Sequence, residues 1–157
     1  MKIKLDASDK IFEVISLLFL ITNILIVALS ISTLPDTIPT HFNFDGEPND
    51  YGSKKELWII PAVACFIYML TGLLNSYPHL YNYPSQKNDK ESQYKLGSKL
   101  MRSLRAWVLF FIAMVTYMIV HSAKTGTAKS SIWLLLFIFA IVAGHLIWFF
   151  IRWRKIK

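Results

Sequence analysis

The sequence predicts an all-α integral membrane protein with four transmembrane helices, and its composition and charge distribution are the basis for this fold class. Of the 157 residues, 54% are hydrophobic and only 17% are charged, whereas soluble domains carry about a quarter charged residues. The apolar residues form four long runs, and most of the charges lie between the runs. A helix that rises about 1.5 Å per residue needs about 20 apolar residues to cross the hydrocarbon core. We therefore expect one polytopic membrane domain over residues 1–157.

The four apolar runs place the expected spans at residues 11–31, 57–76, 104–122 and 132–151. The first run is longer than the apolar core of about 7–15 residues that is typical of a cleavable signal peptide, so we expect a retained helix. The single cysteine, Cys65, lies inside the second run. One cysteine excludes an intramolecular disulfide.

The distribution of lysine and arginine predicts the orientation in the membrane. These residues are concentrated in the N-terminal segment, in the connection of residues 77–105 and in the C-terminal tail. By the positive-inside rule, these three segments lie in the cytoplasm. Both termini are then cytoplasmic, and the loop of residues 34–56 lies on the outer side. The chain is expected to cross the cytoplasmic membrane in multiple passes.

The connection before the third span predicts a basic amphipathic cytoplasmic helix. Leu96, Leu100 and Leu104 recur at helical spacing, and a capping pattern places the start of the helix at Asn88. The interleaved basic residues are Lys95, Lys99, Arg102 and Arg105. We expect Arg105 to snorkel toward the interface. Anionic lipid at the cytoplasmic face is a predicted partner, because each basic residue adds about 1 kcal/mol of attraction to it. The positive-inside rule accounts for these charges without nucleic acid, which is not expected as a partner.

The outer loop of residues 34–56 is predicted to be ordered. Pro35 and Pro39 favour extended backbone at its start, and two turn signals follow at Asp45-Gly46 and at residues 49–52. Between them, alternation places two sets of side chains on opposite sides: Thr40, Phe42 and Phe44 against His41 and Asn43. The loop carries more acidic than basic residues.

Candidates for chemistry are few, and no cofactor is predicted. The chain has no glycine-rich phosphate loop, no His-Glu-x-x-His motif and no nucleophile elbow. A divalent metal in the outer loop is an alternative, with His41, Asp45, Glu47 and Asp50 as ligands. A metal site needs three or four convergent ligands. The simpler interpretation is that the acids cap turns and His41 bonds within the loop. Asn43 is expected to organise the loop backbone.

Polar residues within the expected spans are candidates for function, because they are costly to satisfy in hydrocarbon. Asn23 lies near the middle of the first span and His145 in the fourth. For Asn23 we favour an interhelical hydrogen bond, worth about 0.6 kcal/mol on average. His145 beside Gly144 is interpreted as a site of close helix packing. Glu13 is expected to be interfacial and solvated, near the basic entry to the third span.

Two motifs resemble the bacterial membrane domain of unknown function that opens the SdpI-like proteins. The first combines Leu-Pro, Ile-Pro-x-His-aromatic-Asn and Gly-x-Pro-x-x-Tyr-Gly-Ser-Lys, and it is matched by Leu34, Pro35, Ile38, Pro39, His41, Phe42, Asn43, Gly46, Pro48, Tyr51, Gly52, Ser53 and Lys54. The second is Asn82-Tyr83-Pro84 after the second span, with Gln93-Tyr94 opening the basic helix. With the hydrophobic pattern, the resemblance extends over most of the chain.

The resemblance implies a helical membrane protein that is not an enzyme. The named SdpI-like relatives give immunity against a secreted, membrane-active toxin and can sequester a transcriptional repressor at the membrane. We expect this four-span chain to lack the further membrane domain that those relatives carry.

The leading functional hypothesis is a membrane binding and sensing protein, with toxin-peptide immunity or signalling as its role. The acidic outer loop would capture a cationic or amphipathic extracellular peptide, and helix movement would alter the inner face at Asn82-Tyr83-Pro84. The residues that bind the ligand or organise the loop are expected to be His41, Phe42, Asn43, Tyr51, Gly52 and Lys54. Two alternatives stay open: a metal-dependent membrane enzyme that uses His41, and a small transporter or accessory subunit with Asn23 and His145 along its pathway. The oligomeric state is also open.

Overall fold

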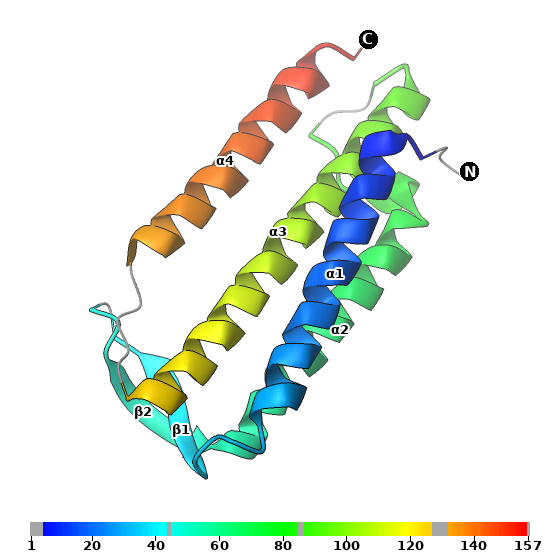
Figure 1. Ribbon diagram of the computed structural model, residues 1–157. Helices are drawn as coiled ribbons and strands as arrows, with labels where there is room; N and C mark the ends of the chain where they lie inside the picture. The colour runs from blue at the N-terminus through cyan, green and yellow to red at the C-terminus, as the bar shows by residue number, and fades with distance from the viewer. Residues whose placement is uncertain (1–4, 44, 85–86, 127–131, 157) are drawn as a thin grey trace.

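Four helices form the body of the protein, and a two-stranded hairpin closes one end (Figure 1). The computed structural model describes residues 5–43, 45–84, 87–126 and 132–156. The helices are α1 (Ala7–Ser30), α2 (Ile59–Asn75), α3 (Lys90–Thr125) and α4 (Ile132–Arg154). With the short helix η1 (Lys54–Trp58) leading into α2, all four are long and apolar enough to cross a membrane. The predicted set of four helices is confirmed.

The longest helix, α3, is the centre of the bundle and packs against each of the other three. Its 36 residues correspond to about 54 Å at 1.5 Å per residue. The predicted basic amphipathic helix and the predicted third span are thus parts of one continuous helix. The helix starts one residue later than predicted, because Asp89 is the N-cap and its carboxylate accepts a hydrogen bond from Ser92 N at 3.0 Å.

The hairpin consists of antiparallel strands β1 (Thr37–Phe42) and β2 (Pro48–Ser53). Gly46, at a φ of 80°, supplies the left-handed residue of its turn. The register shifts on both sides of His41, so the pairing is irregular there. The predicted alternation of faces is therefore wrong at this point: Thr40 and His41 are both exposed. Phe44, which belonged to the same prediction, lies outside the described residues.

An apolar cluster fixes the hairpin to the ends of α1 and α3. Ile38 of β1 and Leu57 of η1 are 1% and 2% exposed. The buried members of this hairpin cluster are Val27, Leu34, Ile38, Leu57, Ile119 and Val120. Burying an isoleucine or leucine side chain contributes about 1.5–3 kcal/mol, so the hairpin is part of the folded body.

Both termini lie at the end of the bundle opposite the hairpin (Figure 1). The connection from α2 to α3 also folds at that end, with a short helix η2 (Pro78–Leu80) that packs against α3. In Figure 1, α4 stands apart from α1, and a groove lined by residues of α1, α3 and α4 opens between them.

Candidate functional site

Helices α1 and α3 run in the same direction and are paired in a constant register. Both begin at the end that holds the termini and finish at the hairpin (Figure 1). The polar contacts Asp6–Lys99 and Asn23–Thr116 both join residues 93 positions apart. Glu13–Arg105 joins residues 92 apart. A parallel pair with one offset places each residue of α1 beside a defined residue of α3.

The polar residues of this interface recur every seven positions along α1. Asp9, Ser16, Asn23 and Ser30 are all buried, and a seven-residue step returns to nearly the same side of a helix. Asn23 is fully buried and donates from Nδ2 to Thr116 Oγ1 at 2.7 Å, an interhelical hydrogen bond of the kind expected above. We call the α1–α3 interface along these four residues the polar seam.

At the end of the bundle near the termini, the polar seam leads into a cluster of charged side chains. Its acidic members come from the start of α1 and its basic members from α3; together Asp6, Asp9, Glu13, Lys99, Arg102 and Arg105 are here called the ion-pair network. The acids and the bases recur at steps of three or four residues, which places each set on one side of its helix. The parallel register then brings the two sets together.

The first ion pair holds the start of α1. Lys99 Nζ lies 2.6 Å from Asp6 Oδ2. Asp6 is also the N-cap of α1, where it and Asp9 form a reciprocal capping box with two 3.0 Å hydrogen bonds. The hydrogen bond from Lys99, followed by that from Ser8, holds the pKa of the Asp6 carboxyl well below its usual range. Asp6 therefore stays ionised and paired at neutral pH.

Glu13 is the centre of the deeper part of the network. Its carboxylate accepts hydrogen bonds from Arg102 Nε at 3.0 Å and from Arg105 Nη2. Arg102 Nη1 also lies 3.6 Å from Asp9 Oδ1. The Arg105 guanidinium carbon sits 4.6 Å from the ring centroid of Tyr68, so the network includes α2.

One expectation about these residues is wrong: the Arg105 side chain is 1% exposed and does not snorkel. Glu13 lies at the basic entry to the third span, as expected, where it is ion-paired with Arg102 and Arg105 and its side chain remains 34% exposed. The physical reason is the α1–α3 register, which offers each charge an opposite charge inside the bundle. An isolated charge would avoid such burial, whereas a paired one tolerates it.

Several polar atoms of this region have no hydrogen-bond partner among the described residues. They are Asp9 Oδ1, Arg102 Nη1, Arg105 Nε and Ser98 Oγ. Buried donors and acceptors are usually satisfied, and exceptions call for an explanation. Two of these atoms, Asp9 Oδ1 and Arg102 Nη1, face each other at 3.6 Å, which is an ion-pair distance but too long for a hydrogen bond. The hydrogen bonding of the network is therefore incomplete at this pair.

The turn of the hairpin is organised by Asn43. Its backbone N–H donates to Glu47 O at 2.9 Å, its side-chain Oδ1 accepts from Glu47 N at 2.8 Å, and its carbonyl accepts from Gly46 N at 3.0 Å. Nearby, the ring nitrogen Nδ1 of His41 lies 2.6 Å from Asn49 Oδ1. These bonds fix the tip of the hairpin with short-range contacts.

Lys54 fastens the base of the hairpin. Its Nζ donates to the Leu34 carbonyl at 3.0 Å and lies 3.1 Å from Asp36 Oδ1. Gly52 lies opposite Ile38 in the pairing. A Cβ at Gly52 would lie 2.8 Å from Glu56 Oε2 and 2.9 Å from Thr40 Cγ2, so a larger residue would disturb both. Close packing at the base thus fixes the hairpin as firmly as the bonds at its tip.

The outer surface of the hairpin is acidic with some apolar area. Asp45, Glu47 and Asp50 are exposed, and the Tyr51 side chain is also exposed. Phe42 is half-buried and packs against the hairpin cluster. Within the described residues, no group of three or more His, Cys, Asp or Glu side chains could hold a metal ion. The four suggested metal ligands are therefore not brought together.

The Asn82-Tyr83-Pro84 motif lies at the end of the bundle near the termini. The Tyr83 hydroxyl donates to Pro78 O at 2.9 Å, and its ring stacks on Trp153 of α4 with centroids 5.2 Å apart. Burial raises the pKa of the Tyr83 hydroxyl, which keeps it a neutral donor. A Cβ at Gly97 of α3 would lie 2.7 Å from Tyr83 Oη. Tyr83 therefore joins the connection to α3 and α4, while Asn82 and Pro84 are exposed.

His145 lies on α4 beside α3. Trp107 Nε1 donates to His145 Nε2 at 3.4 Å, and His145 Nδ1 lies 3.1 Å from Ile141 O. The expectation of close packing at Gly144 is wrong, because a Cβ there would meet nothing within 4 Å. Gly144 instead borders the groove between α1 and α4.

Sequence reasoning missed the ion pair between Asp9 and Arg102 and the cation–π contact of Arg105 with Tyr68. It also missed that Gln93 is buried, where its Oε1 accepts a hydrogen bond from Lys87 N at 2.9 Å. For Asp9 a signal was present. Polar residues at positions 9, 16, 23 and 30 share one side of the predicted first helix. That side had to face another helix.

The fold and these sites define a multi-pass membrane protein of four apolar helices with an ordered hairpin at one end. Residues 17–65 match the family model described as "Domain of unknown function (DUF1648)". The matched segment runs from α1 through the hairpin into α2. The predicted resemblance is thus confirmed for these residues, and the match is consistent with a link to the SdpI-like proteins.

One relative is an uncharacterized protein from Archaeoglobus fulgidus, which is 43% identical over 65 residues. The aligned part covers 36% of this chain and 36% of the relative, so the chain matches about a third of that protein's length. Since the relative is archaeal, it does not establish the expected bacterial setting. No solved structure matches the chain significantly.

Proposed function

We propose that this protein is a membrane-embedded binding and sensing module. The hairpin recognises a cationic, amphipathic peptide, and the α1–α3 pair carries the effect of binding to the ion-pair network at the other end. One observation carries the proposal: Ile38 of the hairpin is buried in the same cluster as Val27 of α1 and Val120 of α3. These two helix residues are again 93 positions apart, so the hairpin packs directly on the registered pair.

The ligand class follows from the hairpin surface. Asp45, Glu47 and Asp50 offer negative charge, and Tyr51 offers an exposed aromatic face. Opposite charge steers a cationic ligand to such a surface, and aromatic side chains supply much of the affinity at interfaces. A peptide that also attacks membranes would meet this surface before it meets the bilayer, which agrees with a protective role.

The mechanism is a shift of α1 along or around α3. Packed interfaces move between discrete arrangements rather than by continuous deformation. A shift would exchange the pairing of Glu13 with Arg102 and Arg105, and Asp9 Oδ1, which already lies 3.6 Å from Arg102 Nη1, would take a larger share of the Arg102 pairing. The change would reach the Lys99 end of α3 and thus the cytoplasmic surface.

The orientation in this proposal rests on the lysine and arginine distribution. The positive-inside rule places the termini and the start of α3 in the cytoplasm, and the hairpin outside. If the ligand binds outside and the response occurs inside, a structural element must connect the two sides of the bilayer. The α1–α3 helix pair is long enough to do so.

Binding and response are separable by experiment. The probe is a synthetic amphipathic peptide of alternating lysine and leucine, applied to cells that carry a membrane-potential dye. We expect wild-type protein to reduce depolarisation several-fold. The triple variant Asp45→Asn, Glu47→Gln, Asp50→Asn should lose both peptide binding and protection. The variant Asn23→Leu should keep binding to purified protein and lose protection.

Lys124→Gln is the matched control, since it removes an exposed charge near the hairpin end without touching the acidic surface. If the triple variant binds the peptide as wild type does, the hairpin is not the recognition surface. If Asn23→Leu protects as wild type does, the polar seam does not carry the response.

A further inference from the structure

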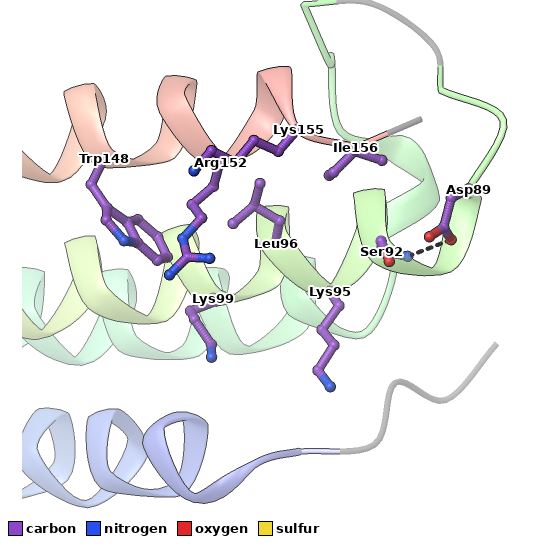
Figure 2. A pocket seen from close by; sticks show the side chains of 9 residues that line it. All are labelled: Asp89, Ser92, Lys95, Leu96, Lys99, Trp148, Arg152, Lys155 and Ile156. Atoms are coloured by element: carbon purple, nitrogen blue, oxygen red, sulfur yellow. Dashed lines mark hydrogen bonds between the residues drawn. The ribbon is translucent and has the colours of Figure 1, made fainter.

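A cationic pocket between α3 and α4 lies at the end of the bundle near the termini (Figure 2). It encloses about 610 Å³, a volume in the range of small-molecule sites. Figure 2 shows Trp148 and Arg152 reaching from α4 toward Leu96 and Lys99 of α3. The residues that line it are Asp89, Ser92, Lys95, Leu96, Lys99, Trp148, Arg152, Lys155 and Ile156.

Most of the positive charge of the pocket is not neutralised by any residue that the structure describes. Lys95, Arg152 and Lys155 have no ion-pair partner among the described residues. Because Lys99 is already paired with Asp6, it lines the pocket but does not serve as an anion ligand. The one acid of the pocket, Asp89, caps α3 through Ser92 N and lies at the end away from Trp148 (Figure 2). An anion is the complementary ligand.

An apolar groove adjoins the cationic pocket. It also encloses about 610 Å³ and runs between α1 and α4 along α3. The two share Lys99 and Trp148, so the groove begins where the pocket ends. Phe12, Trp107 and Ile141 line the groove, and the open space beside Gly144 belongs to it. An anion site that continues into an apolar groove matches a molecule with a charged head and a hydrocarbon chain.

We propose that this pocket and groove bind one anionic phospholipid. Its phosphate is held by Arg152 beside the Trp148 ring, Lys95 and Lys155 add positive charge on either side of the pocket (Figure 2), and one acyl chain follows the groove past Gly144. Basic pockets between transmembrane helices are suited to anionic head groups, and tryptophan is favoured where head group and hydrocarbon meet. The bound lipid fills the space that separates α4 from α1 and so fixes α4 against the rest of the bundle.

The test measures lipid binding to the purified full chain by native mass spectrometry, with phosphatidylglycerol and phosphatidylcholine as probes. We expect phosphatidylglycerol to bind at least tenfold more tightly. Arg152→Gln should weaken it about fivefold, which corresponds to about 1 kcal/mol. The matched control is Arg154→Gln, which removes an exposed charge of the same tail outside the pocket and should change affinity less than twofold.

Two further variants separate the head-group site from the groove. Gly144→Phe adds bulk in the open space, leaves every charge in place and should weaken phosphatidylglycerol binding at least fivefold at unchanged helicity. Asp89→Asn keeps a capping side chain, removes the acid and should strengthen binding. Phosphatidylglycerol with brominated chains should quench tryptophan emission less in Gly144→Phe than in wild type.

Three outcomes would overturn the proposal. Equal losses in Arg152→Gln and Arg154→Gln would show attraction to the tail as a whole. Equal binding of the two lipids would show that the head group is not recognised. Displacement by millimolar inorganic phosphate, but not by chloride at matched ionic strength, together with an unaffected Gly144→Phe variant, would show a site for free phosphate instead of a lipid.

Discussion

The two ends of the α1–α3 pair use opposite chemistry in the same register. At the hairpin, Val27 and Val120 are 93 positions apart and lie in an apolar cluster with Ile38. At the end near the termini, Asp6 and Lys99 share this offset and form an ion pair. The apolar end is held by buried hydrocarbon side chains, whereas the charged end is held by ion pairs in which Arg102 is shared between Asp9 and Glu13, and Glu13 between Arg102 and Arg105. The charged end therefore offers its ions alternative partners, which the apolar end lacks.

The largest effect is expected at the charged end. Glu13→Leu leaves the Arg105 guanidinium, whose side chain is 1% exposed, without its carboxylate partner, and breaking a buried pair in this way costs about 3–5 kcal/mol. The free energy of unfolding, measured by denaturant titration in detergent micelles, should fall by that amount. The double variant Glu13→Leu, Arg105→Leu should recover part of the loss, because apolar residues replace a buried pair at little cost. A single variant as stable as wild type would contradict a buried network.

At the apolar end, Ile38→Ala should disrupt the packing of the hairpin against α1 and α3. The side chain is 1% exposed, and such truncations cost about 2–5 kcal/mol. We expect the hairpin also to detach locally more often, without unfolding of the whole protein. Limited proteolysis should therefore cut within residues 37–53 faster than in wild type. Tyr51→Ala is the matched control in the neighbouring strand, and its exposed side chain predicts a change within about 0.5 kcal/mol. Equal proteolysis of the two variants would mean that the cluster does not anchor the hairpin.

The middle of the polar seam should respond less strongly. Asn23→Leu removes the hydrogen bond to Thr116, and such bonds contribute about 0.6 kcal/mol on average in membranes. A double-mutant cycle with Thr116→Val isolates this coupling energy. A coupling near zero would show that the two side chains do not depend on each other. The polar seam would then not be a continuous path of interaction between the two ends of the bundle.

The smallest effect concerns pH and the Asp6–Lys99 pair. Because Asp6 has a lower pKa in the folded protein than its ordinary 3.8, the pair stabilises the fold above about pH 4. This contribution is lost as the pH falls through the folded-state pKa. For a partly exposed pair it is below about 1 kcal/mol. Asp6→Asn should flatten the acid limb of a stability–pH curve, whereas Asp45→Asn, an exposed acid of the hairpin, should leave it unchanged.

The four helices were predictable because each is a long apolar run, and run length is a local property of the sequence. An ordered outer loop was also predictable from local signals, namely prolines and turn residues close together, but the pairing of its two strands as a hairpin was not predicted. Its register shift at His41 was not predictable either, because pairing depends on how residues 37–42 and 48–53 meet.

The ion-pair network was beyond sequence reasoning, although its residues were named as charges. Glu13 and Arg105 are 92 positions apart, and nothing local shows that α1 and α3 are parallel neighbours. The positive-inside rule explained Arg102 and Arg105 as membrane-surface charges, and although Glu13 was expected near the basic entry to the third span, nothing indicated that it would pair with them inside the bundle. Only the constant offset between the two helices reveals the pairing.

The most direct test of the coupling between the two ends is hydrogen–deuterium exchange in lipid nanodiscs, read at residues 6–16 and 98–105. The comparison is Ile38→Ala against Tyr51→Ala. If the registered α1–α3 pair transmits a change at the hairpin, Ile38→Ala will accelerate exchange in both distant segments, of which residues 6–16 lie roughly 17–32 Å from Val27 along α1, and Tyr51→Ala will not. Exchange that increases only within residues 34–57 would contradict transmission along the pair.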